Sequence, residues 1–439
     1  MNCESEVTYV VAPGGTLKGT IRVPGDKSIS HRSIMLGALA DGVTAIDGFL
    51  EGEDSLATLR AFQEMGVHIE RRAPGRVIVH GVGLDGLQAP NGPIYLGNSG
   101  TSMRLLSGIL AAQPFNTILE GDASLMQRPM RRVTRPLEQM GGRIITTEAG
   151  TPPLEIRGGR TLRGIHYKMP VASAQVKSAL LLAGLYAQGE TCVTEPAPTR
   201  DHTERMLEAF SWPVERKGRR ICVRGGGRLR ATRIQVPGDI SSAAFFMVGA
   251  ALVPDGDIVL EQLGVNPTRT GVINILRRMG VDIQLLNERR AGGEPVADIR
   301  VRGGELRGIR IPEEEVPLAI DEFPAIFIAA ACARGTTVLT GAEELRVKES
   351  DRIQVMADGL NALGIGAQAT ADGMVIEGGG LQGGEVDSHG DHRIAMAFTM
   401  AALRAKGEIR ILDCANVATS FPGFVEMACR AGMSLRVEG

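Results

Sequence analysis

Basic side chains lie next to hydroxyl and acidic side chains in several short segments of the chain. Lys27 and Arg32 flank Ser28, which stands four residues before Arg32 and shares one face of a predicted helix with it. Lys348 and Arg352 share a helical face in the same way. Arginine binds phosphate or carboxylate through two parallel hydrogen bonds, whereas lysine acts as a point charge. These segments indicate a substrate pair rich in phosphate and carboxylate.

Six segments predict helices that begin on polar residues and continue as almost wholly apolar runs. Such a helix is buried along its length, and its first turn carries free N–H groups and the positive end of the helix dipole. If internal symmetry directs these starts at one cleft, the cleft attracts anions. One of them, Asp239, is more simply explained as a helix cap than as a catalyst. The six starts are Asp26–Ser28, Asn98–Thr101, Ser173–Gln175, Asp239–Ser241, Asp321–Glu322 and Asp391–Arg393.

The helices belong to a segment that repeats along the chain. The sequence VPGD begins both at Val23 and at Val236, each time before a helix of small apolar residues, a glycine break and a β-rich run. Related copies begin at Gly97, Ser173, Asp321 and Gly390. The spacing of about 70 residues suits a small α/β unit. Six units are predicted, three in each of two lobes.

The second VPGD segment lies just past the middle of the chain and suggests where the lobes divide. We predict one lobe over residues 24–235, and a second over residues 1–23 and 236–439, with the first residues crossing back to join it. Because no long Ser/Gly linker separates them, hinge motion is expected around Val23–Gly25 and Val236–Gly238.

Composition excludes several classes of protein. The 439 residues are 43% hydrophobic and 22% charged with a net charge of −2, so no overall basic field attracts nucleic acid or a membrane. Aromatic residues make up only 4%, which disfavours stacking on single strands. The first residues contain no apolar signal segment, and a cytoplasmic location is expected.

Cysteine and histidine spacing predicts neither a disulfide framework nor a metal site. No CxxC pair occurs, so the scattered cysteines are expected to be free or buried thiols in a reducing compartment. The sequence also lacks HExxH, P-loop and GxSxG motifs. No metal-ligand spacing is apparent among His31, His68, His80, His166 and His202.

The segments around the polar helix starts and the basic clusters resemble those of the enolpyruvyltransferase family. They occur in the same order as in that family and extend over nearly the whole chain. The resemblance implies an inside-out α/β fold of two lobes, each with three βαβαββ units and pseudo-threefold symmetry. It also implies closure on substrate and no metal or organic cofactor. The expected partners are small-molecule substrates, with no nucleic acid and no membrane, and a monomer is expected. The matching segments are Pro24–Arg32, Gly97–Arg104, Gln127–Pro129, Ser173–Leu185, Val236–Phe246, Arg346–Ile353 and Gly390–Ala397.

The resemblance implies transfer of the enolpyruvyl group of phosphoenolpyruvate to the 5-hydroxyl of shikimate 3-phosphate, a step of the shikimate pathway of aromatic amino-acid biosynthesis. The residues implied to bind shikimate 3-phosphate are Lys27, Ser28, Arg32, Ser173, Gln175, Asp321 and Lys348. The residues implied to bind phosphoenolpyruvate are Lys27, Gly100, Arg128, Gln175, Arg352 and Arg393.

The implied chemistry needs both an acid and a base, since a hydroxyl loses a proton while a vinyl carbon gains one. Asp321 is the implied base, and Glu349, together with Lys27, is the implied proton donor. His392 is implied to take part in the proton traffic. Because Gly100 is retained, ordinary sensitivity to glyphosate, which competes with phosphoenolpyruvate, is expected.

The chain departs from many family members at three positions, where it has Ala174, Glu344 and Thr419. No ligand role is therefore assigned to Glu344 or Thr419. The runner-up activity is transfer to UDP-N-acetylglucosamine, but such enzymes use a loop cysteine where this chain has Ala123.

Two readings from other classes are weaker. A non-catalytic binding protein would be expected to lack the acid and base groups, which are present here. Nucleic-acid binding through the segments at Arg131 and Arg219 conflicts with the near-neutral charge.

Overall fold

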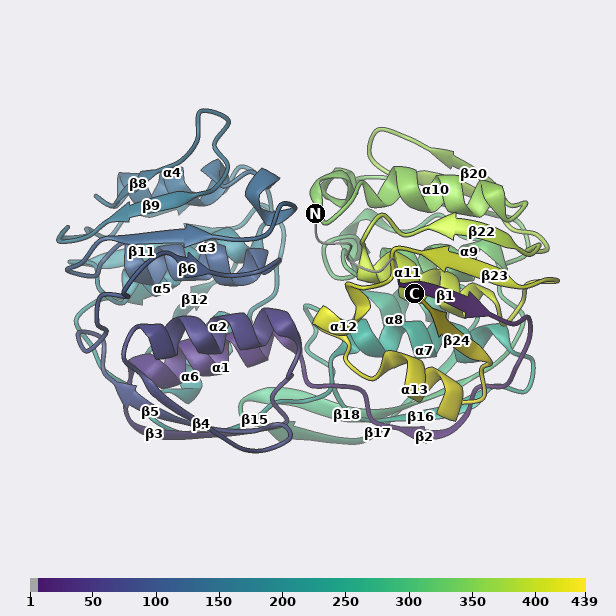
Figure 1. The fold of residues 1–439 in the computed structure, drawn as a ribbon, viewed down its shortest axis with the longest axis horizontal. Helices are drawn as coiled ribbons and strands as arrows, with labels where there is room; N and C mark the ends of the chain where they lie inside the picture. The colour runs from purple at the N-terminus through teal and green to yellow at the C-terminus, as the bar shows by residue number, and fades with distance from the viewer. Residues whose placement is uncertain (1–6) are drawn as a thin grey trace. The chain divides into compact units, whose positions relative to one another are not determined.

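The computed structural model describes residues 7–439, which fold as two compact units (Figure 1). Unit N consists of Gly25–Val236 and Arg290–Glu294. Unit C consists, within the described residues, of Val7–Pro24, Pro237–Arg289 and Pro295–Gly439. Each unit has its own hydrophobic core. Nothing in the repeat pattern indicates that Arg290–Glu294, at the turn of a hairpin, belongs to unit N.

The three sheets of unit N share one strand order. In each sheet, the strand at one edge runs parallel to its neighbour. That neighbour pairs antiparallel with the next strand across the sheet, which pairs antiparallel with the strand at the other edge. In that order, the first sheet contains β14 (Leu229–Arg230) with β15 (Arg233–Gln235), β3 (Ala40–Asp47), β5 (Arg76–Val82) and β4 (His68–Ala73). The second contains β6 (Ile94–Tyr95), β7 (Thr117–Glu120), β9 (Leu154–Arg157) and β8 (Arg143–Ile145). The third contains β10 (His166–Lys168), β11 (Glu190–Thr194), β13 (Arg220–Arg224) and β12 (Glu215–Lys217).

Unit C repeats this strand order, but distant segments complete two of its sheets. In one sheet the order is β2 (Lys18–Ile21), β16 (Asp257–Gly264), β18 (Glu294–Arg302) and β17 (Asp282–Ala291). In another the order is β22 (Gly384–Asp387), β23 (Ile409–Leu412), β1 (Thr8–Val11) and β24 (Leu435–Glu438). The remaining sheet contains β19 (Thr336–Leu339), β21 (Met374–Glu377) and β20 (Gly366–Ala369), and isolated parallel bridges stand where its first strand would lie.

Within each unit the sheets lie outside and one helix of each repeat lies inside. In unit N the inner helices are α1 (Lys27–Leu39), α3 (Gly100–Leu110) and α5 (Ala174–Gly184), and the outer ones are α2 (Glu53–Glu64), α4 (Arg131–Gln139) and α6 (His202–Ala209). In unit C the inner helices are α7 (Ile240–Leu252), α9 (Phe323–Ala331) and α11 (His392–Ala401). Its other helices are α8 (Gly271–Arg278), α10 (Arg352–Ala362), α12 (Val417–Ser420) and α13 (Phe424–Arg430). Short 3-10 turns lie at η1 (Leu125–Gln127), η2 (Glu313–Glu315) and η3 (Glu343–Val347).

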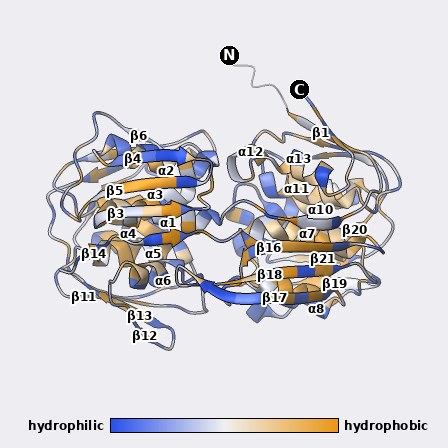
Figure 2. Cartoon of the chain, turned by 90° about the horizontal axis from the view of Figure 1, so that it is seen from below, coloured by the Kyte–Doolittle hydropathy of each residue, from blue (hydrophilic) through white to orange (hydrophobic). Residues whose placement is uncertain are grey.

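Hydrophobic composition explains why these helices are inside. Every residue of α7 and of α9 is buried, and a helix that is apolar on all sides needs cover on all sides. The helices α7, α9 and α11 pack against one another, and α3 packs against α1 and α5. Figure 2 shows the hydrophobic inner helices and the mixed colouring of the strands around them. No helix within residues 7–439 is long and apolar enough to cross a membrane.

The second helix of each repeat ends in the same backbone conformation. The helices α2, α4, α8, α10 and α13 are each followed by a glycine with positive φ, a conformation that favours glycine because it has no Cβ. After α6 the same place is taken by Ser211, with φ of 66°. Four of these five glycines follow Met or Leu in the sequence, so a Met-Gly or Leu-Gly pair marks a helix end in this chain. The glycines are Gly66, Gly141, Gly280, Gly364 and Gly432.

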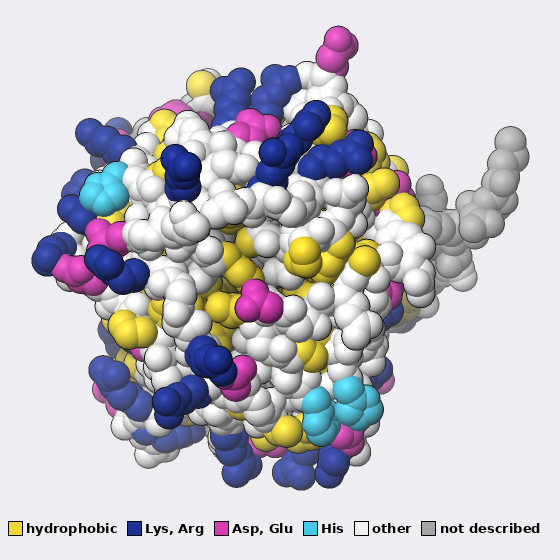
Figure 3. All heavy atoms as spheres, turned by 90° about the vertical axis from the view of Figure 1, so that its left-hand side faces the viewer, with side chains coloured by type: hydrophobic (Ala, Val, Ile, Leu, Met, Phe, Trp, Pro, Cys, Tyr) yellow, Lys and Arg dark blue, Asp and Glu magenta, His cyan; other side chains and the backbone are white. Residues whose placement is uncertain are grey.

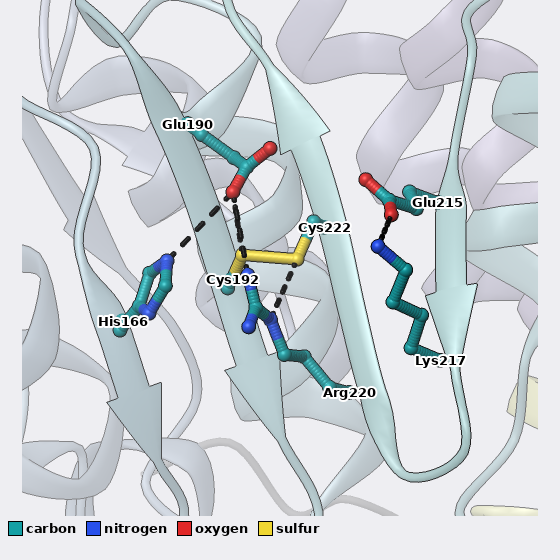
Figure 4. Close-up of a disulfide and its surroundings, with 7 residues drawn as sticks. All are labelled: His166, Glu190, Cys192, Glu215, Lys217, Arg220 and Cys222. Atoms are coloured by element: carbon teal, nitrogen blue, oxygen red, sulfur yellow. Dashed lines mark hydrogen bonds and ion pairs between the residues drawn. A yellow bond between two sulfur atoms is a disulfide. The ribbon is translucent and has the colours of Figure 1, made fainter.

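A disulfide joins the two middle strands of the third sheet of unit N (Figure 4). Cys192 on β11 stands opposite Cys222 on β13, with their Cα atoms 4.1 Å apart. The prediction of free thiols was wrong for this pair. The two residues are 30 positions apart in the sequence and become neighbours only through strand pairing. Cys332, Cys414 and Cys429 are free thiols, and Cys3 lies outside the described residues.

The disulfide makes a simple prediction about thiol counts. Protein that is alkylated during lysis and then denatured without reductant should contain two more titratable thiols after reduction than before, because reduction opens the Cys192–Cys222 bond. Mass spectrometry of the two alkylated forms assigns the residues. A Cys192→Ser, Cys222→Ser double variant is the control and should show no difference. Equal counts in the unmodified protein would contradict the bond.

Candidate active site

The start of α1 in unit N holds Lys27 in a defined position. Asp26 caps the helix by accepting a hydrogen bond of 2.8 Å from the backbone N–H of Ile29. The Lys27 ammonium group lies 2.9 Å from Oδ2 of Asp54, in the first turn of α2. Its side chain is only 18% exposed, so the ammonium group is presented from a largely enclosed position.

Arg32, one turn further along α1, is enclosed by protein groups from three helices. Its Nε donates to Thr203 Oγ1 on α6 at 2.7 Å, and one Nη donates to Ser178 Oγ on α5 at 2.8 Å. The other Nη donates to the backbone oxygen of Ser28 at 2.9 Å. Burial lowers the pKa of Arg32 to about 10, so the guanidinium remains charged at neutral pH. Arg32 thus positions Ser28 and links α1 to α5 and α6.

Two guanidinium groups lie over the start of α3. Ser99 caps the helix by accepting from the N–H of Ser102 at 3.2 Å. A methyl group added to Gly100 would lie 3.0 Å from a Nη atom of Arg104 and 3.1 Å from one of Arg128. The absence of a Cβ therefore lets both arginines reach the helix terminus, where the dipole is already positive.

Arg128 is held in this position by the loop before α3. Its guanidinium donates to the backbone oxygen of Asn98 at 3.3 Å, to the Asn98 side-chain oxygen, and to Ser124 Oγ at 3.3 Å. Arg104 lies on α3 itself and is buried. Sequence reasoning gave Arg104 no role, although its place one turn after Gly100 was a usable signal. Fixed cations at the positive end of a helix dipole form an arrangement suited to a phosphate or carboxylate.

The start of α5 adjoins the start of α3. Ser173 caps α5, accepting from the N–H of Val176 at 3.4 Å. Gln175 Nε2 donates to Thr101 Oγ1 at 3.0 Å, and Gln175 Oε1 is buried without a hydrogen-bond partner in the part of the chain that the structure describes. Unit N thus brings Gly100, Arg128 and Gln175 together, three of the six residues implied to bind phosphoenolpyruvate.

Unit C brings two of the predicted acid–base residues, Glu349 and Asp321, next to Arg352. Arg352 Nε donates to Asp391 Oδ2 at 2.7 Å, and one Nη donates to Glu349 Oε2 at 2.7 Å. The other Nη lies 3.5 Å from Asp321 Oδ1. The Arg352 side chain is 1% exposed, whereas Glu349 is 26% and Asp321 is 14% exposed. Arg352 therefore holds two more accessible carboxylates in place.

Lys348 and Arg393 complete the cluster around Asp321. The Lys348 ammonium lies 3.4 Å from Asp321 Oδ1 and 3.4 Å from Glu344 Oε1. Arg393, in the first turn of α11, donates to the backbone oxygen of Asp321 at 3.1 Å. The next residue before it, His392, is buried. Unit C thus brings together all six predicted residues of this half of the chain.

Asp391 is buried within this cluster and accepts hydrogen bonds from Arg352. From the sequence, Asp391 is identified only as the start of a helix. One carboxylate oxygen accepts from the Arg393 backbone N–H at 2.9 Å, capping α11, and the other accepts from Ser350 Oγ at 3.2 Å. Burial works to raise the pKa of Asp391, but the Arg352 guanidinium outweighs it and holds this pKa below the usual value. Burial likewise opposes the charge of Arg352, yet the surrounding carboxylates raise the pKa of Arg352.

Two other buried groups have structural explanations. His31 on α1 lies fully buried with Nδ1 2.7 Å from Thr58 Oγ1, and burial with the nearby Lys27 and Arg32 lowers the pKa of His31 well below its usual value. Asp239 caps α7 by accepting from the N–H of Ser241 at 2.8 Å, as the capping interpretation predicted.

A sequence model of the family described as EPSP synthase (3-phosphoshikimate 1-carboxyvinyltransferase) matches residues 11–427. The chain belongs to the EPSP synthase family. It is 68% identical to a 3-phosphoshikimate 1-carboxyvinyltransferase from Methylococcus capsulatus over 434 residues, covering 99% of each chain. A protein of the same name from Nitrosococcus oceani is 67% identical and is covered to 98%, with 99% of this chain aligned.

A solved structure of EPSP synthase from Acinetobacter baumannii agrees with this assignment. It is 60% identical, with a TM-score of 0.89, and the match covers 99% of this chain and 100% of that one. The predicted family and the inside-out α/β fold of two three-repeat lobes are therefore confirmed.

The Arg352–Asp391 pair leads to a prediction about stability. Replacing Asp391 by Asn should lower the free energy of unfolding at pH 7 by roughly 3–5 kcal/mol, because the buried guanidinium loses its main partner. The folded pKa of Asp391 lies below its ordinary value of 3.8, so its contribution is complete above that pH and is lost as pH falls through the folded value.

The stability difference between wild type and Asp391→Asn should therefore be full at pH 7 and shrink below pH 3.8. Urea unfolding of the two proteins, followed by circular dichroism at pH 7 and again below pH 3.8, measures this difference. Asp387→Asn, on a half-exposed carboxylate of β22, is the matched control and should change stability little. A variant at position 391 as stable as wild type at pH 7 would contradict the role of the pair.

Proposed function

We propose that the protein transfers the enolpyruvyl group of phosphoenolpyruvate to the 5-hydroxyl of shikimate 3-phosphate and releases inorganic phosphate. The match to the EPSP synthase family over nearly the whole chain carries this proposal. The reaction is a step of the shikimate pathway of aromatic amino-acid biosynthesis. Both substrates carry phosphate, and phosphoenolpyruvate also carries carboxylate, which suits the guanidinium and ammonium groups described above.

The reaction takes place in two steps whose protons must be managed. In the addition, the 5-hydroxyl oxygen bonds to C2 of phosphoenolpyruvate, the hydroxyl loses its proton and C3 gains one. In the elimination, the C2–O bond to phosphate breaks and C3 gives up a proton to restore the double bond. Each step therefore requires a positioned base and a positioned acid. The developing charge on phosphate requires fixed cations.

Asp321, Glu349 and Lys27 are proposed as the groups that move these protons. Asp321 is the proposed base for the hydroxyl, and its carboxylate is held between Lys348 and Arg352. Glu349 is the proposed proton donor to C3, together with Lys27, and His392 is proposed to assist proton movement.

The anionic substrates are proposed to bind the cations near the helix starts. Phosphoenolpyruvate is assigned to Lys27, Gly100, Arg128, Gln175, Arg352 and Arg393. Shikimate 3-phosphate is assigned to Lys27, Ser28, Arg32, Ser173, Gln175, Asp321 and Lys348. Residues of unit N make up one part of each set, and residues of unit C make up the other.

Transfer to UDP-N-acetylglucosamine is not favoured, because the relatives that match the whole chain are named for transfer to shikimate 3-phosphate. We also propose that the enzyme acts in the cytoplasm as a monomer. The Cys192–Cys222 bond is unusual for a reducing compartment. Alkylation during lysis therefore shows whether the bond is present in the cell, which bears on the proposed cytoplasmic location.

Turnover assays test the proposed reaction. Phosphate release from phosphoenolpyruvate should depend on shikimate 3-phosphate and should not occur with UDP-N-acetylglucosamine. Asp321→Asn should lower kcat by about 10²–10⁴-fold, the usual contribution of a positioned acid or base. Asp282→Asn, on an exposed residue of β17, is the control. No turnover with shikimate 3-phosphate would refute the proposal, and a fully active Asp321→Asn would refute the assigned base.

Gly100 is predicted to control how closely phosphoenolpyruvate and its competitors approach α3. In Gly100→Ala the new methyl group lies within about 3 Å of both guanidinium ends, so Arg104 and Arg128 must shift. Small displacements of positioning groups are costly, and a roughly tenfold rise in KM for phosphoenolpyruvate is expected. Inhibition by glyphosate should weaken by at least the same factor. Steady-state kinetics with and without glyphosate measure both effects.

Gly92→Ala is the matched control, since no atom of its surroundings lies within 4 Å of the added methyl group. It should leave KM and inhibition as in wild type. If Gly100→Ala also left both values unchanged, the predicted crowding of the two arginines would be wrong.

A further inference from the structure

Two histidines and a glutamate meet on the outer face of the first sheet of unit N. His68 begins β4, and Glu70 follows two residues later on the same face of the strand. His80 on β5 stands directly opposite His68 in the antiparallel register. The neighbouring pair Ile69 and Val79 is buried in the core, so the three polar side chains face away from it. Exposed histidine side chains gather beside acidic ones on the face drawn in Figure 3.

The three side chains already point their ligand atoms at one place. His80 Nε2 lies 2.7 Å from Glu70 Oε1, and His68 Nε2 lies 3.6 Å from the same oxygen. The ligand atoms all lie within 4.8 Å of one another. The two imidazole rings have centroids 4.8 Å apart and are tilted by 44° rather than stacked flat. In tetrahedral coordination with bonds of about 2.0–2.2 Å, ligand atoms are about 3.4 Å apart, so small side-chain rotations suffice.

We propose that His68, Glu70 and His80 form a binding site for a divalent transition-metal ion, with Zn²⁺ as the reference ion. Two imidazole nitrogens and one carboxylate oxygen are ligands that Zn²⁺ prefers, and water takes the fourth position. The histidines are 12 residues apart in the sequence, so their spacing does not resemble a linear metal motif. Only the pairing of β4 with β5 brings them together.

Charges around the site tune its affinity. Arg72 donates two hydrogen bonds to Glu70, both to Oε2, at 3.0 and 2.9 Å. This leaves Oε1 facing the histidines but places a cation next to the proposed ion. The other arginines of the hairpin pair with separate carboxylates, Arg71 with Glu51 and Arg76 with Asp47. Removing the Arg72 charge should therefore strengthen metal binding.

A bound ion would join β4 to β5. Because β5 packs against α1, the clip would stabilise the repeat that carries Lys27, Ser28 and Arg32. An ion that binds only the folded chain raises its stability by linkage. The site would therefore act on stability rather than on the chemical step.

Isothermal titration of the full chain with Zn²⁺ tests the site. His68→Ala and His80→Ala should each weaken binding by about tenfold or more, since each removes one of three ligands. Arg72→Gln should strengthen binding several-fold. His389→Ala removes an exposed histidine of unit C and is the matched control, expected to bind as wild type does. Turnover should be the same in all four variants.

A second measurement identifies the ligand atoms by spectroscopy. With one equivalent of Cu²⁺, the electron paramagnetic resonance spectrum of the wild type should show hyperfine splitting from two imidazole nitrogens, and His80→Ala should remove one of them. Equal Zn²⁺ affinities in wild type, His68→Ala and His80→Ala would overturn the proposal. A copper spectrum without nitrogen splitting would overturn it as well.

Discussion

The need to enclose apolar helices on every side is the constraint from which the rest of the structure follows. Helices such as α7 and α9 have no polar face that could contact water. Three such helices packed together are covered by three sheets, and each sheet can be hydrophobic only on its inner face. The charged side chains of the inner helices all lie in the first two turns. Functional side chains are accordingly concentrated at helix N-termini, where backbone N–H groups already favour anions.

Charged side chains in such enclosed positions must form ion pairs, and these pairs do more than offset the cost of removing the charges from water. Asp391 is fully buried and holds Arg352 through two nitrogens while also capping α11. Lys177 in unit N is paired in a similar way with Glu195 and Glu204, and burial raises the pKa of Glu204. Ion pairs of this kind contribute little net stability compared with apolar packing. They do fix the direction of each guanidinium or ammonium group before a substrate arrives, which is what electrostatic catalysis requires.

The fold and the positions of most candidate site residues could be predicted from the sequence because both depend on local patterns. Helix starts, glycine-marked helix ends and the two VPGD segments are read over a few residues each, and Asp321, Lys348, Glu349 and Arg352 stand next to such marks. What could not be predicted depends on strand register. The Cys192–Cys222 bond and the meeting of His68 with His80 each require a particular residue of one strand to face a particular residue of another. Asp391 was recognised as a helix start, but its partner Arg352 lies 39 residues away.

Some strands pair with strands that are distant in the sequence, and this pairing also affects the order in which the two units can be completed. Apart from Arg290–Glu294, unit N is one continuous segment, and its first sheet is closed by β14 and β15 at the end of that segment. Unit C needs β2 beside β16 and β1 between β23 and β24. Thr8 pairs with Glu438, so nearly the whole chain must be closed into a loop before that sheet forms. Contacts of such long range form slowly because loop closure precedes any gain from pairing. The repeat architecture thus favours early folding of unit N from local contacts, and the cluster around Arg352 depends on a unit that is completed later.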